Sequence, residues 1–305
     1  MRRRLQWIFG ILLVAVFLIA VAFWLRPVEL FAAQSEFRLL LSGAESRTTY
    51  LAPYRVRVHY YVLGPRSGPP VVLVHGLGGH AEDWVQLAPY FVRAGYRVYL
   101  PDLVGYGQSP KPSVFSYSIR DEEGVVVAFL DALGLKQVDL GGWSMGGWIV
   151  QWVALEYPER VRKLMLFDSA GLARKPDWDT GLFTPTTAVE LSELDDLLMP
   201  HPPTIPGFVA ADILRNSKQN AWVIRKALAS MLTGRDATDT LLPTLKTPVL
   251  IVWGAMDRIT PLSEGEAMHK LVPGSQFNVI LGCGHLAPSM CAPQIGPNVV
   301  AFLHR

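Results

Sequence analysis

The sequence predicts an α/β protein: a mostly parallel, doubly wound sheet with an inserted helical cap, preceded by one N-terminal transmembrane helix. Three observations predict this fold. Segments with strand character alternate with helical segments from about residue 50 onward, which is typical of a parallel sheet covered by helices on both faces. Residues 170–240 interrupt that alternation, and a long apolar run stands near the N-terminus.

Composition excludes several classes of protein. Half of the 305 residues are hydrophobic and 18% are charged, which excludes a disordered chain. Arg2, Arg3 and Arg4 are three of the 28 basic residues, which face 26 acidic ones, so the rest of the chain has no basic excess for nucleic-acid binding. The two cysteines, Cys283 and Cys291, are too few for a disulfide-rich scaffold. We expect both to be free thiols, although an exported body would permit a disulfide.

The first predicted element is a membrane anchor within residues 1–28. Trp7 to Leu25 contains no polar side chain and would span roughly 28 Å as a helix, close to the thickness of a bilayer core. This run is longer than the apolar part of a signal peptide, about 7–15 residues, so we expect an uncleaved anchor. Ala32 and Ala33 leave cleavage open. The arginines at positions 2–4 favour a cytoplasmic N-terminus and a body on the non-cytoplasmic side.

The remaining elements follow in order. Residues 29–49 are expected to connect the anchor to a domain over residues 50–305. Short apolar or alternating runs predict strands at 55–62, 71–74, 97–100, 138–140, 161–167, 248–253 and 277–281. Helices are expected near 83–94, 118–133, 145–157, 263–271 and 293–304. A continuous apolar run such as Val71–Val74 is typical of a strand buried on both faces.

The interruption at about 170–240 predicts a small helical cap, because so long a segment without a strand is too long for a loop. A helical stretch is expected at about 208–232. The apolar side chains of the cap either pack on the core or line a pocket for an acyl chain, and the sequence leaves both open. They are Leu182, Phe183, Leu197, Leu198, Met199, Ile205, Phe208 and Val209.

The strongest functional signal is the G-x-S-x-G motif formed by Gly142, Ser144 and Gly146. It follows an expected strand and opens an expected helix, which is the context of a nucleophile elbow. The tight turn requires glycines and presents the Ser144 hydroxyl at a helix N-terminus, where the dipole and free amides stabilise negative charge. We therefore predict that Ser144 is a nucleophile.

A serine nucleophile needs a base and an acid that orients the base. His285 follows the last expected strand on a glycine-containing loop, and Asp257 follows the strand before it. The chain order Ser144, Asp257, His285 is typical of this architecture. Asp168, after the strand at 161–167, is the competing acid, and we favour Asp257 because its turn precedes the His285 loop.

Two backbone amides are needed to stabilise the oxyanion. Met145 follows the nucleophile, and Leu77 lies in the glycine-rich segment His75-Gly76-Leu77-Gly78-Gly79-His80; these are the expected donors. His75 is expected to shape this loop. His80 either lines the pocket or faces solvent.

Several segments together resemble the α/β-hydrolase superfamily over roughly residues 50–305. The closest resemblance is to membrane-anchored monoacylglycerol lipases and carboxylesterases, which have similar Ala-Gly-Leu and Trp-Gly-x-x-Asp segments. The resemblance implies the roles given above for Ser144, Asp257, His285, Leu77 and Met145, with no metal or organic cofactor. It is carried by residues 75–79, 101–109, 142–147, 157–161, 170–172, 253–257 and 284–285.

The expected activity is therefore hydrolysis of monoacylglycerol or similar acyl esters, with the substrate and the lipid bilayer as partners. A serine at the elbow argues against dehalogenase and epoxide hydrolase members, which resemble this chain but use aspartate there. Two alternatives stay open: a carbon–carbon bond hydrolase with the same triad, and a noncatalytic, membrane-tethered binding protein.

Overall fold

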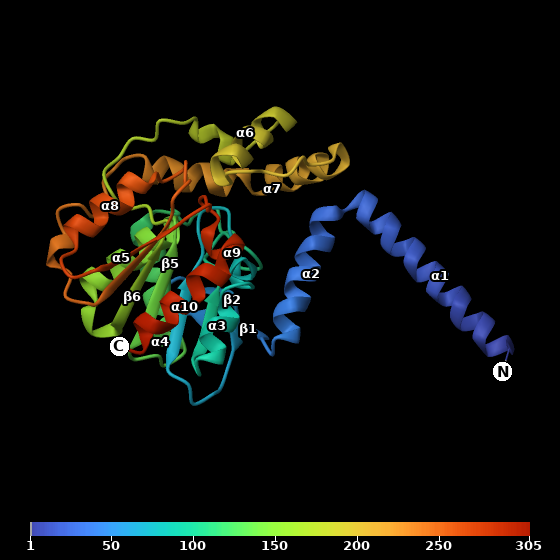
Figure 1. Ribbon diagram of the computed structural model, residues 1–305, viewed down its shortest axis with the longest axis horizontal. Coiled ribbons are helices and arrows are strands. Elements are labelled where there is room, and N and C mark those ends of the chain that lie inside the picture. The colour runs from blue at the N-terminus through green and yellow to red at the C-terminus, as the bar shows by residue number, and fades with distance from the viewer. Residues whose placement is uncertain (1) are drawn as a thin grey trace.

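The computed structural model describes residues 2–305. Met1 and the side chains of residues 2–5 lie outside the described part, and these include the arginines on which the predicted membrane orientation rests. Figure 1 shows a body built on one sheet, with a long helix projecting from it.

The sheet contains eight strands in the described chain, in the order β1-β2-β4-β3-β5-β6-β7-β8. β1 and β2 pair antiparallel, as do β2 and β4, and all other neighbours pair parallel. The mostly parallel, doubly wound sheet is thus confirmed. The strands are β1 (Glu45–Leu51), β2 (Val56–Leu63), β3 (Pro70–Val74), β4 (Arg97–Pro101), β5 (Val138–Trp143), β6 (Val161–Phe167), β7 (Val249–Gly254) and β8 (Gln276–Ile280).

Helices cover both faces of the sheet. One face packs on α4 (Ile119–Ala132), α5 (Met145–Glu156) and α8 (Leu262–Leu271) through a continuous apolar core. The other face packs on η1 (Ala81–Trp84), α3 (Ala88–Arg93) and α10 (Ala292–Leu303). Short elements complete the body: η2 (Pro158–Arg160), η4 (Leu242–Thr244) and α9 (Ala287–Met290).

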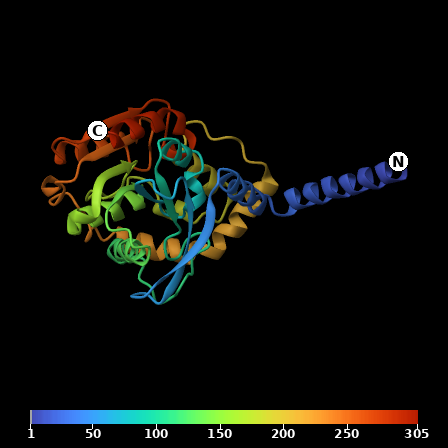
Figure 2. The ribbon, with the colours of Figure 1, turned by 90° about the horizontal axis from the view of Figure 1, so that it is seen from below.

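The segment predicted as an anchor forms helix α1 (Arg2–Leu25), which stands away from the body in two perpendicular views (Figures 1 and 2). Within it, Gln6–Leu25 is the candidate membrane span among the described residues, and none of its most apolar window is buried. The helix ends at Leu25, and after Arg26 a second helix, α2 (Pro27–Leu41), begins. Proline is favoured in the first turn of a helix because its missing N–H is not needed there.

The structure differs from the expected connector at 29–49, because α2 and most of β1 occupy this segment. β1 reads Glu-Ser-Arg-Thr-Thr-Tyr-Leu and is mostly exposed at the sheet edge, so it lacks the apolar alternation that reveals a strand. Its partner is β2, with Thr48 opposite His59. Antiparallel pairing at the edge of the sheet, which the local sequence does not encode, makes it a strand.

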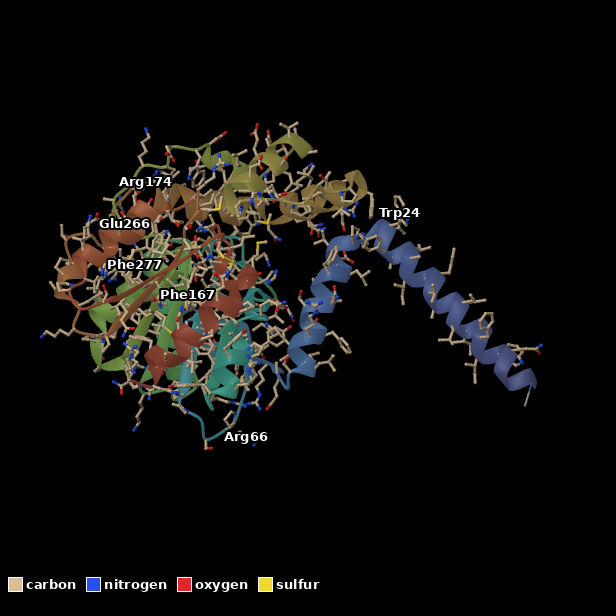
Figure 3. The ribbon with its side chains drawn as sticks, viewed as in Figure 1. Trp24, Arg66, Phe167, Arg174, Glu266 and Phe277 are labelled. Atoms are coloured by element: carbon tan, nitrogen blue, oxygen red, sulfur yellow. A yellow bond between two sulfur atoms is a disulfide. The ribbon has the colours of Figure 1, made fainter. Side chains whose placement is uncertain are left out.

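The anchor is attached to the cap as well as to the body. The rings of Trp24 and Phe208 lie 4.3 Å apart, and Trp24 marks the end of α1 in Figure 3. The backbone N–H of Val28 donates to Oδ2 of buried Asp212 at 3.0 Å. Leu39 of α2 is fully buried against the body.

The cap lies between β6 and β7, as expected, and contains η3 (Thr180–Phe183), α6 (Ala188–Leu198) and α7 (Gly207–Met231). Its two connections to the body lie together, since the N–H of Thr238 donates to the carbonyl of Gly171 at 2.9 Å. The indoles of Trp148 and Trp152, both on α5, donate to the Asp236 carbonyl at 2.6 and 2.7 Å. The base of the cap is therefore fixed to α5.

Candidate active site

Ser144 lies at the junction of β5 and α5, with φ 54° and ψ −119°. This left-handed backbone conformation is costly for a residue with a side chain and is characteristic of functional turns. The flanking glycines are required by close packing. A Cβ at Gly142 would lie 2.2 Å from the Gly146 carbonyl oxygen, and one at Gly146 would lie 2.3 Å from that of Val74.

The structure brings Ser144, His285 and Asp257 together. Nε2 of His285 lies 2.9 Å from the Ser144 hydroxyl, and Nδ1 lies 2.8 Å from Oδ2 of Asp257. Both His285 and Asp257 are buried. These distances suit a chain of hydrogen bonds from the serine to the carboxylate.

The turn after β7 holds the Asp257 carboxylate in place. Its Oδ1 accepts from the backbone N–H groups of Ile259 and Thr260 at 2.8 and 3.0 Å. The Thr260 hydroxyl donates to Oδ2 at 2.8 Å. This hydroxyl was not among the expected site residues, because a threonine after an aspartate gives no signal without the three-dimensional turn.

Asp168, the competing acid, does not contact His285. Its Oδ1 accepts from the N–H of Gly254 at 2.6 Å, while Oδ2 has no partner among residues 2–305. Complete burial, and secondarily the nearby charge of Asp257, raise the pKa of Asp168 well above its usual range. Burial thus favours the uncharged form of the Asp168 carboxyl at the end of β6.

The glycine-rich loop after β3 lies directly against Ser144, since a Cβ on Gly76 would be 3.2 Å from Cβ of Ser144. Leu77 lines the cavity beside Ser144. Met145 is the first residue of α5, so its N–H belongs to the first-turn amides that lack an acceptor within the helix. Both expected donors thus flank Ser144.

The two loop histidines are in different surroundings. His75 is fully buried, accepts at Nε2 from the Leu103 N–H at 3.1 Å, and donates from Nδ1 to the Gly76 carbonyl. Burial lowers its pKa, so it stays neutral and shapes the loop. His80 faces Glu82 and Asp83 instead of the cavity. Burial opposes its charge, but these carboxylates outweigh that cost and raise its pKa to about 9.

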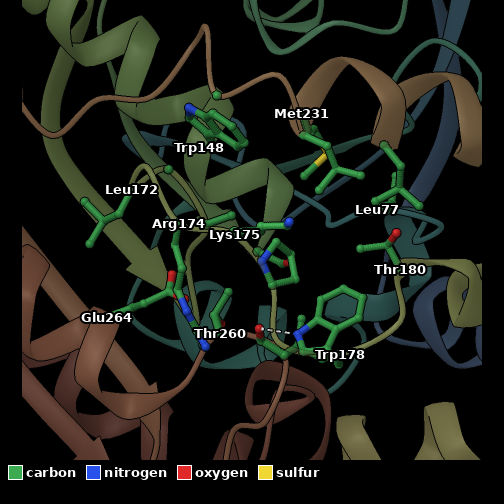
Figure 4. Close-up of a pocket in the computed structure, with 18 of the residues that line it drawn as sticks. Leu77, Trp148, Leu172, Arg174, Lys175, Trp178, Thr180, Met231, Thr260 and Glu264 are labelled. Atoms are coloured by element: carbon green, nitrogen blue, oxygen red, sulfur yellow. Dashed lines mark hydrogen bonds and ion pairs between the residues drawn. The ribbon is translucent and has the colours of Figure 1, made fainter.

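A cavity of about 600 Å³ opens beside Ser144, between the sheet and the cap (Figure 4). Of the eight apolar cap residues singled out in the sequence, only Phe183 lines it, whereas Phe208 packs on the anchor. Sequence reasoning missed most of the lining because it comes from several helices and loops. The large apolar contributors are Leu77, Trp148, Trp178, Leu228 and Met231.

Cys283 and Cys291 form a disulfide, so the expectation of free thiols was wrong. Eight residues of extended chain would separate them by roughly 26 Å. The chain instead turns back through α9, and their Cα atoms lie 6.5 Å apart. The closed loop contains His285.

Comparisons with known proteins agree with this geometry. A family model described as the alpha/beta hydrolase fold matches residues 69–222 and 209–288. Lipase 1 of Psychrobacter immobilis is 28% identical over 254 residues, which are 78% of each chain. A 2-hydroxymuconate semialdehyde hydrolase of Pseudomonas putida is 30% identical over 254 residues, covering 78% of this chain and 87% of the relative.

Among solved structures, the crystal structure of a membrane phospholipase A, a bacterial virulence factor, superposes with a TM-score of 0.82. The two chains are 25% identical, and the match covers 100% of this chain and 98% of the other. The similarity therefore includes the N-terminal helices as well as the sheet and cap.

Proposed function

The chain belongs to the α/β-hydrolase family, and from that membership we propose that it is a serine hydrolase of carboxylic esters. The observation that carries the proposal is the 2.9 Å approach of His285 to the Ser144 hydroxyl, with Asp257 on the other ring nitrogen. An apolar cavity at this hydroxyl supplies space for an acyl chain.

The proposed mechanism uses side chains and backbone alone. His285 takes the Ser144 proton while the oxygen attacks the ester carbonyl, and Asp257 stabilises the imidazolium. The N–H groups of Leu77 and Met145 donate to the oxyanion of the tetrahedral intermediate. His285 then protonates the leaving alcohol, and water hydrolyses the acyl-enzyme by the same steps.

The proposed substrate is a monoacylglycerol or a similar ester with one medium or long acyl chain. Similarity to bacterial lipases and to a membrane phospholipase A supports lipid esters as the substrate class. The candidate span of α1 supports access to lipid, because it would hold the cavity near a bilayer.

We place the body on the non-cytoplasmic side of the membrane. Arginines before the span favour this orientation. The Cys283–Cys291 disulfide supports it, since disulfides persist in oxidising compartments and are rare in the cytosol. Protease added outside the cytoplasmic membrane is expected to degrade the body, and full protection would reverse the orientation.

Carbon–carbon bond hydrolysis is the second candidate. The observation that favours it is the 30% identity to 2-hydroxymuconate semialdehyde hydrolase over most of both chains. The two activities differ in the bond cleaved, so direct comparison of substrates separates them.

The test uses the full chain in detergent with a fluorophosphonate probe, p-nitrophenyl butyrate, mono-oleoylglycerol and a 2-hydroxy-6-oxo-dienoate. We expect labelling and ester turnover in the wild type, and neither in Ser144→Ala. Turnover of the dienoate alone would favour the second candidate. A folded wild type that is not labelled and cleaves none of the three would overturn the assignment.

A further inference from the structure

The cavity beside Ser144 is lined by both apolar and polar side chains. Apolar side chains from the body and from α7, among them Leu77 and Met231, line one part. Arg174, Glu264 and Thr260 are among the polar lining residues, and Figure 4 shows these three on the side away from Leu77 and Met231, with the apolar Leu172 beside Arg174 and Glu264. An ester with an apolar acyl half and a polar alcohol half would match such a lining.

The polar part centres on an ion pair between the cap and the body. Arg174 belongs to the segment that enters the cap, and Glu264 lies in the first turn of α8. Nη1 of Arg174 donates to Oε1 of Glu264, and Nη2 lies 3.2 Å from Asp177. A guanidinium has five N–H donors and a carboxylate has about four acceptor positions, so both groups keep capacity for a ligand.

The ion pair lines the same cavity as the Ser144 hydroxyl. Thr260, four residues before Glu264, contacts both Asp257 and Nδ1 of His285. Burial raises the pKa of Glu264, and the hydrogen bond and positive charge of Arg174 oppose that rise. Ser144, Arg174 and Glu264 all line this one cavity, so an ester bound at the Ser144 hydroxyl has the ion pair within the same chamber.

The charges of the lining cancel. Arg174 and Lys175 are the two cations, and Asp179 and Glu264 are the two anions among the cavity residues. A phosphate would find no excess of positive charge here. A neutral alcohol with several hydroxyls would find both donors and acceptors, which is what each hydroxyl needs.

We infer that Arg174 and Glu264 form the binding subsite for the alcohol half of the substrate, and that this alcohol is a neutral polyol of the glycerol type. The inference rests on the proposed function and deepens it, because it assigns the head-group chemistry and the residues that select it. Acyl esters of simple alcohols would contact the apolar side chains but leave the remaining donor positions of Arg174 and acceptor positions of Glu264 unused, so they would gain no hydrogen bonds there.

The test compares 1-mono-oleoylglycerol with propyl oleate, which has the same carbon chain without the two hydroxyls. Both are presented to the full chain in the same detergent micelles. We expect wild-type kcat/KM to favour the glycerol ester by about 10- to 100-fold, as expected for one or two hydrogen bonds to charged groups. In Glu264→Gln and Arg174→Gln, this ratio is expected to fall to about threefold or less.

Arg160→Gln is the matched control, because Arg160 forms a 2.8 Å ion pair with Asp131 and does not line the cavity. A purely structural role of the Arg174–Glu264 pair would slow both esters equally and leave the ratio at the wild-type value, which would overturn the inference. The wild-type ratio needs no variant: a value below about threefold would overturn it even if both variants failed to fold.

A third substrate, 1-oleoyl-lysophosphatidic acid, tests the charge argument. We expect it to be cleaved less efficiently than mono-oleoylglycerol, and a tenfold preference for the phosphate would overturn the neutral-polyol assignment. If propyl oleate is cleaved and its kcat/KM equals that of mono-oleoylglycerol, the esterase assignment holds and the polyol subsite is refuted. Failure of all three esters would remove the proposed function itself.

Discussion

The hydroxyl of Thr260 donates a 2.8 Å hydrogen bond to Oδ2 of Asp257, the same oxygen that lies 2.8 Å from Nδ1 of His285. The imidazole and the threonine therefore share one acceptor. The backbone N–H of Thr260 also donates to Oδ1, so one residue contacts both oxygens of the carboxylate. In the proposed mechanism Thr260 is a positioning residue, because it holds the Asp257 carboxylate that contacts His285.

Replacing Thr260 with valine keeps the shape of the side chain and removes the hydroxyl. We expect kcat/KM for p-nitrophenyl butyrate to fall about 5- to 50-fold, because a hydrogen bond to a charged group is lost. Thr260→Ser retains the donor and is expected to stay within about threefold of the wild type. Equal activity of the valine and serine variants would contradict the positioning role.

The tight turn around Ser144 predicts that adding one methyl group, at Gly146, will sharply reduce activity and stability. In Gly146→Ala, the new Cβ meets the carbonyl oxygens of Val74 and His75 at 2.3 and 2.4 Å. Displacing Ser144 by about 1 Å can cost about 100-fold in rate, and overpacking costs about 1–3 kcal/mol of stability. Gly207→Ala is the control, because nothing lies within 4 Å of its Cβ. Ester turnover and Tm measure both effects; a Gly146→Ala variant as active as this control would refute the steric argument.

Asp168 predicts a pH dependence of stability. Its pKa is raised in the folded protein, so between its ordinary value near 3.8 and the raised value the unfolded chain ionises while the folded protein stays protonated. The contribution of Asp168 to the free energy of unfolding is greatest below pH 3.8. Above that pH it falls by up to about 1.4 kcal/mol per pH unit, until the raised pKa of the folded state is reached. Asp168→Asn removes this decline. Unfolding free energies between pH 5 and 8 should therefore fall less steeply in the variant, and parallel slopes would exclude a neutral Asp168.

The disulfide closes a short loop around His285. In the loop-entropy model, a loop of this size stabilises the folded state by about 2–3 kcal/mol. We expect the double variant Cys283→Ser, Cys291→Ser to have a lower Tm and lower esterase activity, because the His285 loop loses its constraint. A reducing agent should reproduce both losses in the wild type and change nothing in the variant. Mass spectrometry of non-reduced peptides checks the bond directly.

Local patterns predicted much of the fold. The strand expected at Val161–Phe167 ends in the apolar run at residues 164–167, which is buried between neighbouring strands on both sides, and β6 has these bounds. The Gly142–Gly146 turn was recognisable because its backbone geometry permits few residue types. The order of Ser144, Asp257 and His285 could be inferred because the carboxyl ends of parallel strands meet at one edge of a sheet.

What the sequence did not reveal depends on contacts between distant segments. β1 is a strand through its pairing with β2, and Cys283 meets Cys291 through the fold of α9. The cavity combines Trp148 of α5 with Met231 of α7 and Glu264 of α8. No periodicity relates these positions, so only the assembled structure identifies them as neighbours.

The junction of anchor and cap has a practical consequence. Val28 supplies a backbone N–H to Asp212, Arg215 donates to the Leu25 carbonyl at 2.9 Å, and Phe208 stacks on Trp24. Helix α7 carries Asp212 near one end and the cavity residue Met231 at the other. Removing residues 1–28 to ease purification would therefore leave the Phe208 ring without Trp24 and the buried Asp212 carboxylate without the Val28 N–H. Helix α1 is therefore part of the folded cap region, and activity measured on a truncated protein would report on an altered cavity.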